Sequence, residues 1–188
     1  MRPGRFAYIA PEKLLIRGIA TGSCVGVLGV NTAFNGANCP GFICDNDLIS
    51  RSFILAVVNS RLISRYLVQV CPPKLQGYSR FNANNLNEVP VPRFAFTTPA
   101  ADRARYAEEG RQLYAQFGAT GDPAPLLAFV DAHLSPSNQL PASSNRSDVV
   151  HDLLAFLAEQ MIAMNKAKQV EVRGFLAWLA REIGAPID

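Results

Sequence analysis

Short apolar runs separated by turn residues fill the first fifty positions of the chain. The main runs are Lys13–Ile19, Cys24–Val30 and Gly41–Cys44, and each has the length of a strand rather than of a helix. Turn residues separate them, and Asn35-Gly36 is the best candidate for a hairpin turn because both residue types accept positive φ angles. The pattern predicts a small, largely antiparallel sheet.

Between Ser52 and Val70 the apolar spacing becomes that of a helix. Arg61 and Arg65 lie four residues apart on the polar side of this stretch. Pro72-Pro73 should end the helix, because proline cannot continue the hydrogen-bond ladder. We therefore expect one helix that packs on the sheet. Its apolar face comprises Ile54, Val57, Val58, Leu62, Tyr66 and Leu67.

The second half of the chain has a helical pattern throughout. Residues 100–117 and 124–133 predict two helices, and a further helical stretch runs from Asp148 nearly to the end. The last stretch fits either one long helix or a hairpin that breaks near Asn165–Gln169. Its apolar stripes have the spacing of packing surfaces, and we expect Trp178 to lie in the core.

A segment rich in Ser, Pro and Asn precedes the last helical stretch and carries too few apolar residues to pack. We place a linker there, at residues 134–147. The predicted fold class is α+β, with a small, largely antiparallel sheet packed with helices in residues 1–133 and a C-terminal α-helical module in residues 148–188.

Positive charge is concentrated in the first half of the chain. Residues 1–100 hold ten Lys and Arg against four Asp and Glu, whereas residues 101–188 hold eight against eleven. The first half is therefore the better candidate for a polyanionic partner. The 49% content of hydrophobic residues excludes a disordered tail.

The sequence predicts a cytoplasmic protein without a metal site. The longest purely apolar stretch, Phe53–Val58, is far too short to span a bilayer. Cys24, Cys39, Cys44 and Cys71 form no Cys-x-x-Cys pair of the kind found in zinc ribbons or redox sites. We expect all of these cysteines to be reduced thiols.

No familiar catalytic pattern occurs in the chain. His133 and His151 are the only histidines, and we interpret both as residues of helix surfaces, away in sequence from every cysteine. Asp45 and Asp47 have the spacing of a metal-binding pair, but capping of the following helix is the simpler role. The sequence has no Gly-rich phosphate loop and no Asn-Pro-Pro-Tyr tetrapeptide for methyl transfer. We expect no catalysis by this chain alone.

Several short motifs follow one another in a distinctive order. They are the Lys13–Arg17 strand, Asn59-Ser60-Arg61-Leu62 within a helix, a loop of proline and lysine, and the ending Asn85–Pro92. In this order they resemble the C-terminal specificity, or target-recognition, domain of Taq-type adenine-specific DNA methyltransferases, a family that includes the type II G restriction-modification enzymes. The resemblance covers about residues 10–95, and Val58 stands where that family usually has leucine.

The resemblance implies a DNA target-recognition region of a restriction-modification or phage-defence adenine-specific DNA methyltransferase, non-catalytic by itself. Its partners would be double-stranded DNA and an upstream methyltransferase domain, and in some members of that family an endonuclease shares the polypeptide. S-adenosylmethionine would bind the catalytic domain, so we expect no cofactor in this chain. Extrusion of the target base by the catalytic domain requires that the duplex be held from both sides.

The segment from Lys74 to Asn82 combines cations, aromatic residues and a glycine without apolar periodicity, which favours a loop that contacts DNA. Arginine suits a bidentate contact to guanine and asparagine one to adenine, whereas lysine meets phosphate. Solvated loops and helix faces, and asparagines that only form turns, are the alternatives. The candidate DNA contacts are Lys74, Tyr78, Arg80, Asn82, Asn84, Arg61, Arg65 and Arg17.

Two other functions stay open. The C-terminal helices also fit a subunit-docking module with little DNA contact, and a small hydrolase that uses Cys71 or His133 is the remaining alternative. Binding to random duplex at two salt concentrations separates recognition from docking, because phosphate contacts weaken steeply with salt.

Overall fold

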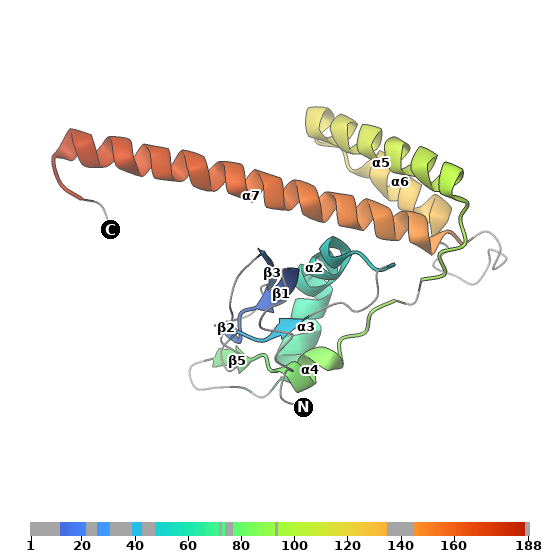
Figure 1. Ribbon diagram of the computed structural model, residues 1–188, viewed down its shortest axis with the longest axis horizontal. Helices are drawn as coiled ribbons and strands as arrows, with labels where there is room; N and C mark the ends of the chain where they lie inside the picture. The colour runs from blue at the N-terminus through green and yellow to red at the C-terminus, as the bar shows by residue number, and fades with distance from the viewer. Residues whose placement is uncertain are drawn as a thin grey trace.

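The computed structural model describes residues 12–21, 26–30, 39–42, 48–71, 73, 77–92, 94–134 and 145–186. Two small antiparallel sheets and a set of helices make up this part of the chain, so the predicted α+β class is confirmed (Figure 1). In chain order the elements are β1 (Glu12–Ile16), β2 (Ile19–Thr21), β3 (Gly26–Val30), β4 (Gly41–Phe42), α2 (Arg51–Asn59), α3 (Arg61–Val70), β5 (Tyr78–Arg80), α4 (Ala83–Asn87), α5 (Ala100–Thr120), α6 (Ala124–His133) and α7 (Ser147–Ile183).

The predicted antiparallel sheet is confirmed. β1 is the central strand of a three-stranded sheet with the order β3-β1-β4, and Leu14 lies opposite both Leu28 and Phe42. A second, two-stranded sheet pairs β2 with β5. The predicted turn at Asn35-Gly36 and the Asp45 and Asp47 pair lie outside the described residues.

The prediction of a single helix from Ser52 to Val70 is wrong. The chain breaks at Ser60, whose extended backbone separates α2 from α3 at an angle of 66°. Ser60 ends α2 by donating its N–H to the carbonyl of Val57, and its Oγ accepts from the N–H of Ile63 at 3.2 Å to cap α3. The break resets the helical register, so Leu62 is 77% exposed although an unbroken helix would place it on the apolar face.

Asn59 ties the end of α2 to the sheet. Its Oδ1 accepts from the N–H of Gly26 at 2.8 Å, and its Nδ2 donates to the carbonyl of the same residue at 3.0 Å. The Asn59-Ser60 pair therefore fixes α2 against β3 and starts α3 in a new direction. Within the Asn59-Ser60-Arg61-Leu62 motif, Asn59 and Ser60 therefore stabilise the fold rather than contact DNA.

Two hydrophobic cores organise the described residues. The first lies between β2, β5 and the helices α2 to α4, and it comprises Ile16, Ala20, Val58, Ile63, Leu67, Cys71, Phe81 and Leu86. The second lies between α5, α6 and α7, with Phe129, Val149 and Leu153 at its centre. Helices α5 and α6 thus share a core with the start of α7 (Figure 1). The predicted boundaries at 1–133, 134–147 and 148–188 stay a prediction.

The last helical stretch is one helix rather than a hairpin. α7 runs unbroken to Ile183 and ends at Gly184, whose φ of 66° is a left-handed cap that glycine accepts readily. Its N-terminal part packs on α2, α5 and α6, whereas the C-terminal part extends past them (Figure 1). The expectation that Trp178 lies in the core is wrong, since it is 48% exposed and no described element covers it.

The two halves of the chain are joined at a buried aromatic cluster around His151. The His151 ring lies about 5 Å from the rings of Phe53, Phe94 and Phe96. Its Nε2 accepts from the N–H of Ser50 at 3.0 Å, so the neutral ring carries its proton on Nδ1 and donates it to Asp152. The expectation of a helix-surface histidine is wrong here, because α2 and the 94–98 segment cover this side of α7.

Asp152 connects this cluster to α5. Both carboxylate oxygens accept from Arg103 at 2.7 Å, and one also accepts from His151. Burial raises the pKa of Asp152, but the hydrogen bonds from His151 and Arg103 and the positive charge of Arg103 outweigh burial and hold this pKa below its ordinary value of 3.8. The folded protein therefore keeps Asp152 charged at a pH where the unfolded chain takes up a proton.

This shift predicts an acid-dependent loss of stability. The contribution of Asp152 is fully present above the unfolded pKa and is lost as pH falls through 3.8 toward the lower folded value. Asp152→Asn should cost about 1–3 kcal/mol at pH 7, and this difference from wild type should shrink toward pH 3. Urea denaturation at several pH values measures both. Asp102→Asn in the exposed Asp102–Arg105 pair is the control, and a pH-independent effect of Asp152→Asn would contradict the assignment.

Candidate nucleic-acid interface

The pairing of β2 with β5, which forms the β2–β5 ribbon, brings Arg80, in β5, to the part of the fold where Arg17 precedes β2. Both were predicted DNA contacts, and they are distant in sequence. Ile19 pairs with Arg80 and Thr21 with Tyr78, and the N–H of Phe81 donates to the carbonyl of Gly18. Tyr78 and Arg80 were expected in a loop, and this expectation is wrong: they belong to a strand whose partner lies far back in the chain.

One face of this ribbon is exposed and the other is buried. Arg17, Tyr78 and Arg80 are exposed, whereas Ala20 and Ser79, which alternate with them, are buried against the first core. Arg17 lies just before β2, next to Gly18, whose carbonyl accepts from the N–H of Phe81, the residue after Arg80. The core beneath the ribbon holds both backbones in place, so two guanidinium groups and a phenol project from a fixed platform.

Arg61 and Arg65 lie on a separate surface, the outer side of α3. Both are exposed, and Ile63 and Leu67 on the opposite side of the helix are buried. Leu62 adds an exposed apolar group between the arginines. No described contact joins this surface to the outer face of the ribbon, so the predicted contacts form two groups.

The predicted asparagine contacts differ in what they do within the fold. Asn82 caps α4, since its Oδ1 accepts from the N–H of Asn85 at 3.0 Å. Asn85 in turn donates to the carbonyl of Val70 at 3.4 Å. Asn84 is exposed and has no such bond within the described residues, which leaves its amide available. Lys74 lies outside the described residues. All these contacts stay predictions.

Some arginines of the chain are paired with carboxylates and others are not. In the helical half Arg103, Arg105 and Arg111 each pair with a carboxylate at 2.7 to 3.1 Å. Across the described ranges of the first half, Arg17, Arg61, Arg65 and Arg80 have no carboxylate partner. Exposed and uncompensated guanidinium groups are suited to phosphate and to base edges, because such partners are not displaced from an existing ion pair.

The structure gives Cys71 the properties of an inert core thiol. Burial raises the pKa of the Cys71 thiol, and the negative charge of Glu88 raises it further, so the reactive thiolate is disfavoured. His133 belongs to the other core, where its Nδ1 donates to the carbonyl of Phe129 at 2.8 Å. The expectation that His133 lies on a helix surface is wrong, because Tyr106 and Phe129 pack against its ring.

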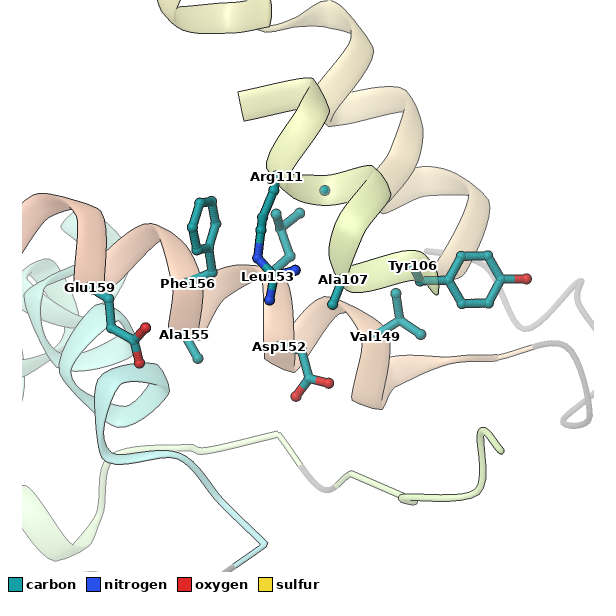
Figure 2. A pocket seen from close by; sticks show the side chains of 10 residues that line it. Tyr106, Ala107, Arg111, Val149, Asp152, Leu153, Ala155, Phe156 and Glu159 are labelled. Atoms are coloured by element: carbon teal, nitrogen blue, oxygen red, sulfur yellow. The ribbon is translucent and has the colours of Figure 1, made fainter. Parts of the chain in front are cut away.

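A pocket of about 280 Å³ lies between α5 and α7. Figure 2 shows its lining, in which Phe156 and Leu153 contribute apolar surface and Arg111, Asp152 and Glu159 contribute charge. Each of these charged groups already has a partner within the fold, since Arg111 pairs with Glu108 and Glu159 accepts from Ser52. The residues that line the pocket include none of Arg17, Arg61, Arg65 and Arg80. Within the residues that the structure describes, no three His, Cys, Asp or Glu side chains are grouped as metal ligands.

The described helices were also tested for membrane spans. Taken singly, none of them is both long and apolar enough to cross a bilayer. The bent pair of α2 and α3 reaches the required length and composition only when its two helices are counted together.

Comparison with known proteins gives a family match for the first half of the chain. The family model of the TaqI-like C-terminal specificity domain matches residues 2–91, which include both sheets and α2 to α4. No curated protein and no solved structure matches the chain significantly. The match covers the exposed ribbon and the arginine surface of α3, and it confirms the resemblance expected from the sequence motifs. Residues 2–91 are therefore similar to the TaqI-like C-terminal specificity domain.

Proposed function

We propose that this chain is the DNA target-recognition region of an adenine-specific DNA methyltransferase of a restriction-modification or phage-defence system. The family match over residues 2–91 carries this proposal, because specificity domains of this family supply DNA recognition in methyltransferases. The exposed, uncompensated arginines of the same segment support it independently.

The β2–β5 ribbon is the element that we propose enters a groove. The major groove admits a two-stranded ribbon as well as a helix, and its base edges distinguish all four base pairs. Arg80 on β5 would make a bidentate contact to guanine, and Arg17 at the start of β2 would contact phosphate. Arg61 and Arg65, four residues apart on α3, would follow the backbone and fix the register of the domain on DNA.

Catalysis belongs to another domain in this proposal. A methyltransferase domain preceding the specificity region would bind S-adenosylmethionine and extrude the adenine, while this region holds the other side of the duplex. The inert surroundings of Cys71 and His133 support a non-catalytic role. The partners are therefore double-stranded DNA and that methyltransferase domain.

A salt titration of the purified chain on duplex DNA tests the proposal. We expect binding at about 50 mM salt that falls steeply by about 200 mM, with log affinity decreasing by about 0.9 per phosphate contacted. Absence of binding at low salt, or binding that does not respond to salt, would contradict a role in DNA recognition. A single-stranded oligonucleotide of the same sequence is the control for duplex preference.

A further inference from the structure

The C-terminal part of α7 carries an apolar stripe that the described residues leave uncovered. Every residue from Ala163 to Trp178 is exposed, and the helix extends past α2, α5 and α6 (Figure 1). The stripe consists of Val172, Phe175, Leu176, Leu179 and Ile183, which recur at helical spacing on one side of α7. Phe175 is 57% exposed and Ile183 equally so, and contiguous apolar surface of this kind marks an interaction site.

We propose that this stripe pairs with the same stripe of a second copy of the chain, with the two helices antiparallel. The twofold axis would pass close to Phe175. The stripe is straight and narrow, which suits another helix better than a sheet or a loop. Phe175, which is 57% exposed, would lie at the centre of the seam.

The charges along the stripe favour a second copy of the chain as the partner. They also favour antiparallel over parallel pairing of the two helices. Lys168 and Glu182 lie seven residues before and seven residues after Phe175, so all three line up on one side of the helix. Antiparallel pairing about Phe175 places Lys168 of each copy beside Glu182 of the other. A parallel pair would instead place lysine against lysine and glutamate against glutamate. Neither Lys168 nor Glu182 has an opposite charge as partner within the described part of the chain.

The size of the seam sets the expected affinity. Residues 167–183 of each copy would overlap over about 25 Å of helix. This contact is smaller than the roughly 800 Å² per partner of a typical stable interface. We therefore expect a reversible dimer with a dissociation constant in the micromolar range.

Sedimentation of the full chain between about 1 and 200 µM tests the pairing. We expect a monomer–dimer equilibrium in which Lys168→Glu weakens association by about tenfold or more, because it places like charges together twice. The double variant Lys168→Glu with Glu182→Lys should restore association, since exchange of both charges recreates the opposite pairs. Lys166→Glu, on the opposite side of α7, is the matched control and should leave the equilibrium unchanged.

The Lys168→Glu variant and its double variant with Glu182→Lys test whether the proposed pairing occurs. A monomer at every concentration would overturn the proposal. A dimer that ignores Lys168→Glu, or one that the double variant fails to restore, would overturn it as well. Circular dichroism of each variant verifies that α7 stays helical. DNA binding is a separate measurement, so failure of the dimer leaves the proposed recognition function standing.

Discussion

Replacing Arg17 and Arg80 together with alanine should weaken binding of the chain to duplex DNA by about 10- to 100-fold at low salt. Both side chains are exposed, Arg80 on β5 and Arg17 just before β2, and neither has a carboxylate partner within the described residues. Their full charge is therefore available to DNA. Fluorescence anisotropy with a labelled duplex at a fixed salt concentration measures the loss.

The matched control is the double variant Arg105→Ala with Arg111→Ala. It removes the same charge from the exposed surface of α5, where each arginine already pairs with a carboxylate. We expect less than a threefold effect on affinity. If both double variants weaken binding equally, net charge rather than the ribbon determines affinity, and the proposed interface is wrong.

Phe53→Ala should destabilise the fold by about 3–5 kcal/mol, a large share of the roughly 5–15 kcal/mol that holds a domain together. Phe53 on α2 is 1% exposed, and its ring lies 4.9 Å from Phe94 and 4.8 Å from His151 on α7. Truncation would leave a cavity where the two halves of the chain meet. Urea denaturation followed by circular dichroism measures the loss.

If Phe53→Ala does not fold, Phe53→Leu can be measured in its place. We expect its loss of stability to be intermediate. Leu62→Ala on the neighbouring helix is the control, because Leu62 is 77% exposed and should change stability by only about 0.5 kcal/mol. A loss below about 1 kcal/mol for Phe53→Ala would show that the cluster around His151 does not join the halves.

Local signals were sufficient for much of the fold. The end of α7 at Gly184, the helices on either side of Pro123 and the antiparallel pairing of β1 all follow from turn residues and apolar spacing. The family resemblance could also be recognised from the sequence, because its motifs are contiguous in sequence. These features depend on residues close together in the chain.

The features that sequence reasoning missed depend on contacts between distant residues. Tyr78–Arg80 becomes a strand only because β2 lies beside it. Ser60 breaks a continuous apolar pattern because its hydroxyl caps α3, and Asn59 anchors that break to Gly26. His151 is buried because α2 and the 94–98 segment cover it, which no local pattern reveals.

The central claim is that the ribbon arginines hold DNA, and comparison of salt slopes tests it most directly. For the parent chain and for the Arg17→Ala, Arg80→Ala variant, log affinity for one duplex is plotted against log salt concentration. With Arg17 on a phosphate and Arg80 on a base edge, as proposed, the slope of the variant should be shallower by about 0.9. Equal slopes for the two proteins would contradict the account.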